Sequence, residues 1–256
     1  MTIVDWAAAD AGPVGALYAE EAQYWWQTFS WDTAEQWAHI ETARTTWGLP
    51  GLLARDASGQ TRGWLYYLRT ENAGVQLGGV TASDTATTEA LVNRLTTLEH
   101  DRRLSAFTPA RAPGLAAVFQ RAGWIVTPHV YLTRSTADGL PMPNGPVRVR
   151  PWRGGDTGLA ADLLRHAYAG LDGRLFAPGG QEDEWRSYVR GLTDHAGCGR
   201  FLSGASGVAL ADGFEETPAG VVLTTAIADD MAHIAQIGVN RRLVPGGGGR
   251  SLLGYA

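Results

Sequence analysis

Two stretches of the chain repeat the same succession of apolar and polar blocks. Residues 63–68 and 220–225 are apolar runs of strand length. Each is followed by a short polar turn and a second apolar run, which ends at Val80 in one case and at Val239 in the other. Two such runs joined by a turn are typical of a β-hairpin. We therefore predict one hairpin in each half of the chain.

The residues beyond the first hairpin favour further elements. Leu91, Leu95 and Leu98 are spaced for one face of a helix over 85–99. The following pattern predicts a strand at 104–107, a helix over 112–122 closed by Gly123, and a strand pair over 124–133 broken at Pro128.

The segments before the hairpins contain a weak internal repeat. At one constant offset, residues 4–16 match residues 150–162 at Trp6 and Trp152, at Asp10 and Asp156, and at Gly12 and Gly158. In both stretches a strand-like segment leads into an aspartate and then into an apolar helical pattern. Aspartate suits a helix N-cap because its carboxylate accepts a first-turn N–H. Chance could produce three matches, but the preserved order of elements favours a duplicated αβ unit.

A stretch rich in proline and glycine, 136–146, divides the two copies. It cannot continue a helix or a central strand. We predict an N-terminal domain over 1–135, a linker over 136–146 and a C-terminal domain over 147–256. Only a short tail follows Val239, so we expect the second copy to be incomplete at its C-terminal end. The strand over 231–239 would then have an open edge, which makes a homodimer possible.

Composition narrows the functional classes. The 256 residues are 45% hydrophobic and 18% charged, which excludes a disordered chain. The net charge of −5 argues against a nucleic-acid partner. No apolar run reaches the ~20 residues of a membrane span, and the N-terminus does not resemble a signal peptide, so we expect a cytoplasmic protein with no membrane partner. The single cysteine, Cys198, excludes an intramolecular disulfide and a cysteine-cluster metal site, and we expect no bound metal.

The most distinctive motif is a run of glycines between the second hairpin and a final helical pattern. Pro245 is followed by Gly246, Gly247, Gly248 and Gly249, and then by Arg250 and Ser251. Glycines let the backbone curl and direct several N–H groups at one anion, and a helix that begins there adds its positive end. The run is not a Walker A motif, and the alternative is a flexible glycine linker.

The order of the predicted elements resembles that of the GNAT acyltransferase family: a strand, an Asp-capped helix, a second helix, a hairpin, a glycine loop and a helix. In that family a strand ending in Val precedes a loop Arg/Gln-x-x-Gly-x-Gly/Ala that holds the pyrophosphate of acetyl-CoA. Gly247 and Gly249 match the two motif glycines, while Val244 stands where Arg or Gln is usual. The two copies resemble the tandem layout of mycothiol synthase.

The resemblance implies an α/β fold with a mixed sheet and transfer of an acetyl group from acetyl-CoA to an amine of a small molecule or peptide. It implies that the backbone of Ile237, Gly238 and Val239 pairs with the pantetheine arm, and that residues 244–251 hold the pyrophosphate. His233 stands where a strand glutamate is frequent, so it is the candidate base; a surface or packed histidine is the alternative.

The first copy departs from the family pattern. No glycine loop follows Val80, Phe119 stands where a tyrosine often serves as acid, and Gly74 stands where a carboxylate is frequent. These departures indicate a scaffold or an acceptor-binding copy. An alternative for the whole chain is a non-catalytic tandem module that binds CoA or a protein.

Overall fold

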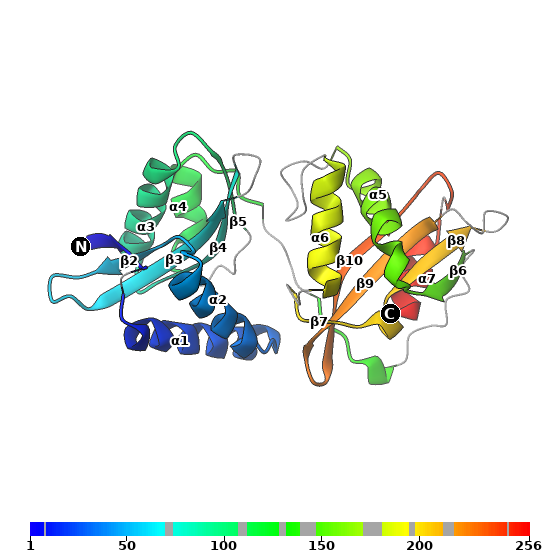
Figure 1. The fold of residues 1–256 in the computed structure, drawn as a ribbon, viewed down its shortest axis with the longest axis horizontal. Coiled ribbons are helices and arrows are strands. Elements are labelled where there is room, and N and C mark those ends of the chain that lie inside the picture. The colour runs from blue at the N-terminus through cyan, green and yellow to red at the C-terminus, as the bar shows by residue number, and fades with distance from the viewer. Residues whose placement is uncertain are drawn as a thin grey trace. The chain divides into compact units, whose positions relative to one another are not determined.

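The computed structural model of the chain divides into two compact units, Met1–His129 (unit 1) and Val130–Ala256 (unit 2) (Figure 1). Each unit is described by itself. The structure describes residues 1–7, 9–69, 74–106, 112–127, 132–138, 147–170, 181–194, 198–211, 218–244 and 246–256, with the side chains of residues 11 and 35 excepted.

Unit 1 contains a five-stranded sheet in the order β1-β2-β3-β4-β5, in which β4 and β5 are parallel and the other neighbours are antiparallel. Its elements are β1 (Thr2–Asp5), α1 (Ala11–Phe29), α2 (Ala34–Thr46), β2 (Gly51–Arg55), β3 (Thr61–Arg69), β4 (Gly74–Ala82), α3 (Thr85–Leu98), β5 (Arg103–Ala106) and α4 (Leu115–Arg121).

Helices cover both faces of this sheet, which explains why β3 is buried over most of its length. Successive side chains of a strand point to opposite faces. Leu65 and Tyr67 therefore pack in the core with α3 and α4, whereas Trp64 and Tyr66 pack in the core with α1 and α2. The sequence of β3 thus reads as a continuous apolar run instead of an alternating one.

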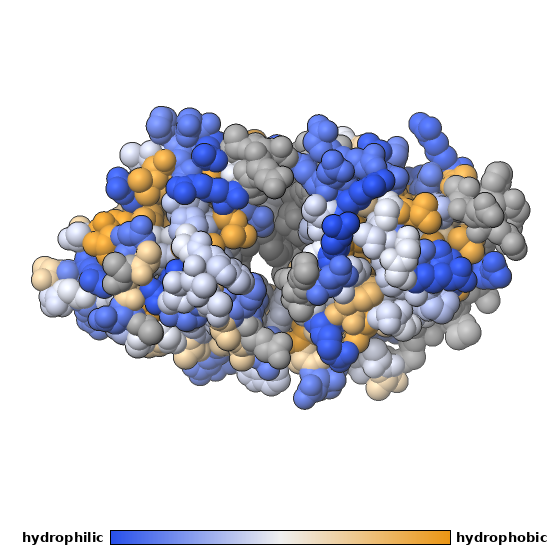
Figure 2. All heavy atoms as spheres, viewed as in Figure 1, coloured by the Kyte–Doolittle hydropathy of each residue, from blue (hydrophilic) through white to orange (hydrophobic). Residues whose placement is uncertain are grey.

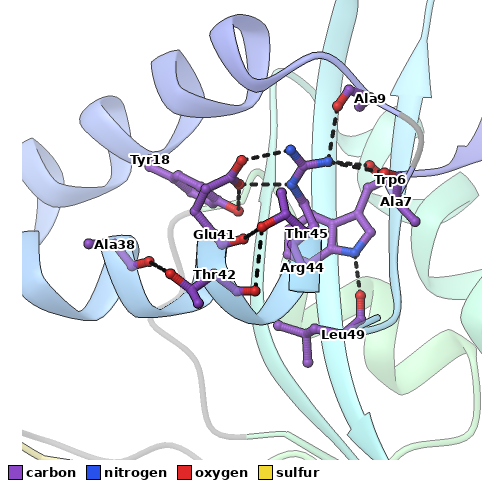
Figure 3. A network of polar contacts seen from close by, with 10 residues as sticks. All are labelled: Trp6, Ala7, Ala9, Tyr18, Ala38, Glu41, Thr42, Arg44, Thr45 and Leu49. Carbon is purple, nitrogen blue, oxygen red and sulfur yellow. Dashed lines mark hydrogen bonds and ion pairs between the residues drawn. The ribbon is translucent and has the colours of Figure 1, made fainter. Parts of the chain in front are cut away.

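A buried arginine holds the α1–α2 side of unit 1 together (Figure 3). The Arg44 guanidinium donates two hydrogen bonds to the Glu41 carboxylate, at 2.7 and 2.8 Å. It also donates to the backbone carbonyl oxygens of Trp6 (2.9 Å) and Ala9 (3.0 Å). The Trp6 indole N–H donates to the Leu49 carbonyl at 2.7 Å. Arg44 therefore ties helix α2 to the segment that joins β1 to α1.

Unit 2 contains a sheet in the order β10-β9-β8-β6, with β7 pairing to β9 as well, and all of these pairs are antiparallel. Its elements are β6 (Val147–Pro151), α5 (Thr157–Ala167), α6 (Glu182–Asp194), β7 (Arg200–Phe201), β8 (Gly207–Ala211), β9 (Pro218–Ala228), β10 (Met231–Val239) and α7 (Gly248–Tyr255), with short 3-10 turns at 136–138, 154–156 and 203–205.

The two faces of this second sheet are also covered by different helices. Val221 and Leu223 of β9 pack in a core with α5 and α6. Val222, between them, packs against Leu252 of α7. Both faces of β9 are therefore buried, and its sequence is apolar at nearly every position.

The hairpins of the two units have the same register. Gly63 pairs with Ala82 as Gly220 pairs with Val239, so one constant offset relates β3–β4 to β9–β10. This register corrects the correspondence predicted from sequence, which matched Val80 with Val239. Each hairpin also has a one-residue irregularity at the same place, between Gly79 and Leu77 in β4 and between Ile234 and Gln236 in β10.

Several elements predicted from the sequence are present, and others needed correction. Both hairpins are confirmed. The helix predicted over 85–99 spans Thr85–Leu98, and the strand predicted at 104–107 is found at Arg103–Ala106. The helix predicted over 112–122 begins only at Leu115. Residues 124–127 and 132–133 form no strand, so the predicted strand pair is wrong there. Residues 128–131 and the predicted linker positions 139–146 lie outside the described residues.

The predicted aspartate caps have the expected position but a different bonding. Asp10 and Asp156 precede α1 and α5, yet neither side chain accepts a hydrogen bond from its own helix. Asp156 instead accepts both Arg150 guanidinium N–H groups at 2.7 and 2.8 Å, and the Arg153 backbone N–H at 2.7 Å. Burial opposes the charge of this carboxyl, but these donors hold its pKa below the usual range.

The surface drawn in Figure 2 is mainly hydrophilic, with apolar residues in small areas among charged and polar ones. In the part of the chain that the structure describes, no helix has the length and the apolar character needed to cross a membrane.

We expect Arg44→Ala to lower the free energy of unfolding of unit 1 by about 3 kcal/mol, because it leaves the half-buried Glu41 carboxylate and the backbone carbonyls of Trp6 and Ala9 without their donor. Chemical denaturation followed by tryptophan fluorescence measures this change. Arg62→Ala is the matched control, since its ion pair with Asp56 is exposed and is worth less than ~1 kcal/mol. Equal losses in the two variants would contradict the role given to Arg44.

Candidate functional site

The connection from β10 to α7 in unit 2 is long and glycine-rich. It runs from Asn240 to Gly247. At its start, the Val244 N–H donates to the Asn240 carbonyl at 3.0 Å, and the Asn240 side-chain oxygen accepts the Arg242 N–H at 3.0 Å. These bonds form a compact turn that brings the chain back to the start of α7.

Helix α7 begins without a side-chain cap. Its N-cap residue, Gly247, has φ +79°, a left-handed conformation that strains other residues. The first N–H groups of a helix have no acceptor within the helix. The backbone N–H groups of Gly248, Gly249 and Arg250 therefore face an end of α7 that no side chain closes. Such an end attracts an anion through its N–H groups and its dipole.

The other residues predicted to hold the pyrophosphate are either exposed to solvent or buried in the fold. Gly246, Gly247 and Arg250 are exposed, and Gly249 is half-buried. Val244 is buried against Ala211 and Ala219, and Ser251 is buried with its hydroxyl donated to the Gly247 carbonyl at 3.3 Å. A Cβ on Gly248 would lie 3.0 Å from Val244, so Gly248 permits close packing. Pro245 lies outside the described residues.

The connection from β10 to α7 and the first turn of α7 contain three arginines. Arg241 and Arg242 follow β10 directly, and both are exposed, as is Arg250. The side chains of all three are therefore accessible to water. Their charges reinforce the preference of the start of α7 for an anion.

The predicted pantetheine strand has backbone groups that face away from the sheet. The Asn240 N–H donates to the Ala219 carbonyl at 2.8 Å, which makes Asn240 and Ala219 a hydrogen-bonded pair. Hydrogen-bonded and non-bonded pairs alternate along an antiparallel ladder. The backbone of Gly238 therefore faces β9, whereas the N–H and C=O groups of Ile237 and Val239 face the other edge. Among the described residues, no strand pairs with β10 at that edge.

The irregularity at Ala235 turns Gln236 toward helices α5 and α6. Ala235 packs in the core below these helices, and Ile234 and Ile237 pack on the opposite face with α7. One extra residue in the strand places Gln236 on the same face as Ala235. There the Tyr168 hydroxyl donates to Gln236 Oε1 at 2.7 Å, and Gln236 Nε2 donates to the Tyr188 hydroxyl at 2.6 Å.

Sequence reasoning missed this Tyr168–Gln236–Tyr188 chain. Tyr168 caps the end of α5 and Tyr188 lies in α6. Nothing in their spacing points to a glutamine in a distant strand. The only available signal was a polar residue within the apolar strand 231–239, and the bulge that aims it is not visible in the sequence.

The candidate base His233 lies on β10 opposite Thr225 of β9 and is half-buried. Burial disfavours the charged imidazolium and lowers the pKa of His233 below its ordinary value. The ring is therefore mainly neutral near pH 7 and is able to accept a proton.

The corresponding place in unit 1 is built differently. Only Ser83 and Asp84 connect β4 to α3, and the Asp84 carboxylate accepts the Thr87 N–H at 2.7 Å. A carboxylate thus already occupies the N-terminal end of α3. The Tyr66 ring also lies against the bulge, because a Cβ on Gly78 would overlap it. Unit 1 therefore lacks the uncapped helix start of unit 2, and an aromatic ring packs against its bulge.

Other chemistry-bearing residues do not assemble into a site. Within the described ranges no group of three or more His, Cys, Asp or Glu residues could hold a metal ion. The thiol of Cys198 is partly buried, and burial raises its pKa, which disfavours the reactive thiolate. Phe119 is buried and packs on Trp124 at 4.6 Å between ring centroids.

No protein-family model and no curated protein sequence matches the chain. Fourteen chains of solved structures match it. A GCN5-related N-acetyltransferase from Sphaerobacter thermophilus has a TM-score of 0.58 at 12% identity, over 99% of this chain and 82% of that one. The GCN5-related glucosamine N-acetyltransferase region of a fungal multi-domain GH3 β-N-acetylglucosaminidase has a TM-score of 0.54 at 13% identity, over 99% of this chain and 33% of that one.

At these identities the likeness shows the fold. The chain has the mixed α/β fold of the GCN5-related N-acetyltransferases, in agreement with the family resemblance seen in the sequence.

We expect the His233 ring to titrate with a midpoint below its ordinary pKa of ~6.5 when followed by NMR. Because the unfolded chain then binds more protons than the folded one, the stability of unit 2 should fall as the pH drops below ~6.5. His233→Gln should remove this part of the pH dependence. A midpoint at or above the ordinary value would show that burial does not determine the pKa of His233.

Proposed function

We propose that unit 2 binds acetyl-CoA and transfers its acetyl group to an amine of a small molecule or peptide. The observation that carries the proposal is the uncapped, glycine-rich start of α7 directly after a bulged strand with outward-facing backbone groups. The N-acetyltransferase fold of solved structures supports it. In this proposal acetyl-CoA is a substrate and no metal takes part.

The proposed contacts follow from the groups that remain available. The pyrophosphate would accept hydrogen bonds from the N–H groups of residues 246–250, and Arg250 would add charge. The pantetheine amides would pair with the Ile237 N–H and with the Val239 backbone, which face outward; the Ile237 carbonyl already accepts a hydrogen bond from the Tyr168 hydroxyl at 3.3 Å. Gly238 would permit the close approach of α5, since a Cβ there would lie 2.9 Å from the Leu164 side chain. Val244 and Ser251 would support the loop from inside instead of touching the ligand.

The reaction would be direct attack of the amine nitrogen on the thioester carbonyl. An amine must be neutral to attack, so a base near β10 assists it. His233 is neutral near pH 7 and is the proposed base.

Unit 1 is proposed to be a copy without a cofactor site, used as a scaffold or for binding the acceptor. The shared element order and hairpin register support a tandem arrangement with domains over 1–135 and 147–256. The Asp84 cap would repel a phosphate from α3, and Tyr66 fills the bulge that a thioester would need.

If residues 246–250 bind the pyrophosphate, we expect saturable binding of acetyl-CoA to the wild-type chain in calorimetric titration. We expect this binding to be lost in Gly247→Glu. The new carboxylate would stand where the phosphates bind and repel them. Gly123→Glu is the matched control, because Gly123 also has a positive φ but lies in unit 1, where a Cβ would meet nothing within 4 Å. Binding that survives Gly247→Glu would place the cofactor elsewhere.

Turnover separates an enzyme from a binding module. We expect release of CoA thiol from acetyl-CoA with at least one member of a panel of primary amines, which should include glucosamine because a neighbour of the same fold is named for it. His233→Gln should lower kcat by roughly 10²-fold, the usual size of a general-base contribution. Tight binding without turnover for any amine would favour the non-catalytic alternative.

A further inference from the structure

Three aromatic side chains cluster at the C-terminal end of α1 in unit 1. The Trp25 ring lies 5.2 Å from the Phe29 ring and 5.3 Å from the Trp31 ring, measured between centroids. Their planes are tilted against Trp25 by 47° and 81°, so neither ring stacks on it face to face. All three residues are half-buried. We call Trp25, Phe29 and Trp31 the aromatic corner.

The aromatic core of unit 1 is packed differently. Trp6, Trp64 and Tyr66 lie with their planes within 12° of parallel, and all three are buried. Stacked rings of this kind cover one another and serve the core. In the aromatic corner, the tilted planes and the partial exposure leave ring surface accessible to a ligand.

A left-handed residue closes the end of α1 and shapes the aromatic corner. Ser30 has φ 51° and is the one non-glycine residue with a positive φ among those that the structure describes. This conformation is uncommon for a residue with a side chain and is a form of local strain. It turns the chain back, so that the Trp31 N–H donates to the Trp25 carbonyl at 3.4 Å. The turn thus returns Trp31 to Trp25.

Negative charge accompanies the aromatic corner. Glu21, one turn before Trp25 in α1, is only 5% exposed. Its carboxylate accepts the Trp25 indole N–H at 3.1 Å and the Thr81 hydroxyl at 2.5 Å. The C-terminal end of α1 adds the negative end of the helix dipole, and its last turn contains no basic residue. Residues 11–43 include five acidic residues and no Arg or Lys. Aromatic faces in such surroundings favour a cation.

The hydrogen bonds of Glu21 indicate which kind of cation fits. One carboxylate oxygen accepts the Trp25 indole and the other accepts Thr81. The carboxylate therefore attracts positive charge without needing an N–H donor from the ligand. A primary ammonium ion is strongly hydrated and would lose hydrogen bonds to water. A quaternary ammonium ion has no N–H group to satisfy, and aromatic faces are its usual partners in proteins.

We propose that the aromatic corner of unit 1 binds a quaternary ammonium group, with the rings against its methyl groups and Glu21 balancing its charge. A quaternary nitrogen has no lone pair, so it cannot be acetylated. The proposed ligand is therefore distinct from the acceptor amine, and its binding does not depend on acetyl-CoA. The acidic surroundings disfavour a zwitterion that carries a phosphate, so we infer a small soluble cation of the choline type.

Matched probes test the charge requirement. Choline and 3,3-dimethylbutan-1-ol have the same shape, but only choline is charged. NMR titration of the full chain, followed through the indole N–H signals, should give a Kd for choline at least about tenfold lower than for the alcohol, because the cation–π contribution needs the charge. Phosphocholine should bind more weakly than choline, because the surrounding carboxylates repel its phosphate.

Variants of the aromatic corner test the location. Trp31→Leu removes one ring and should weaken choline binding about fivefold or more, whereas Trp31→Phe keeps a ring and should retain most of the affinity. Trp26→Leu is the matched control, because Trp26 is the next tryptophan of α1, is 54% exposed and lies outside the aromatic corner. It should bind choline as the wild-type chain does. Thermal unfolding of each variant verifies that the chain is folded during the titration.

The charge of Glu21 has its own variant. Glu21→Gln keeps an oxygen that accepts a hydrogen bond but removes the negative charge. It should weaken choline binding several-fold and leave the affinity for 3,3-dimethylbutan-1-ol unchanged, because the alcohol has no charge to balance. A merely structural role of Glu21 would instead weaken both probes equally.

Four results would overturn the proposal. Equal affinity for choline and the alcohol would show that the aromatic corner is only an apolar surface. Equal losses in Trp31→Leu and Trp26→Leu would place the cation elsewhere. Tighter binding of phosphocholine than of choline would contradict the assignment to a small cation. Absence of choline binding to the wild-type chain would remove the site, while acetyl-CoA binding by unit 2 is measured separately and is unaffected by that outcome.

Discussion

The one-residue bulge in β10 is the constraint on which the candidate site depends. A regular strand would direct Gln236 toward α7, together with Ile234. The extra residue at Ala235 instead turns Gln236 toward α5 and α6, where two tyrosine hydroxyls satisfy its buried carboxamide. A buried amide without partners would be costly, so the bulge and the tyrosines stabilise one another. The same register directs the backbone of Ile237 outward, next to the hydroxyl of Tyr168.

Unit 1 shows that the bulge alone does not make a site. Its hairpin has the same register and the same irregularity, but glycines occupy the strand there and the Tyr66 ring packs on them. The helix that follows β4 begins after two residues and is capped by Asp84. Unit 1 thus has a carboxylate at the start of its helix and an aromatic ring against its bulge. The two units share one hairpin register but differ in local side-chain packing and in the length of the connection that follows the hairpin.

The buried polar residues of the two units have different structural purposes. In unit 1 Arg44 satisfies carbonyls of the segment between β1 and α1, and holds α2 in place through Glu41. In unit 2 the Tyr168–Gln236–Tyr188 chain ties two helices to an edge strand of the sheet. The first network is closed on itself around backbone groups, whereas the second ends at the outward edge of β10, at the Ile237 carbonyl.

The sequence by itself determined the two hairpins, the helix over 85–98 and the glycine run before the last helix, because these depend on local periodicity and on residues with special backbone freedom. It did not determine the register of the hairpins. The sequence pattern matches Val80 with Val239, whereas in the two ladders Ala82 is the counterpart of Val239, because Ala82 pairs with Gly63 as Val239 pairs with Gly220. It also could not show that Val244 and Ser251 are buried, since burial depends on residues distant in the chain. Tertiary structure alone decided which groups of β10 face outward and which tyrosines meet Gln236, because a bulge moves every later side chain to the opposite face and leaves no mark in local composition.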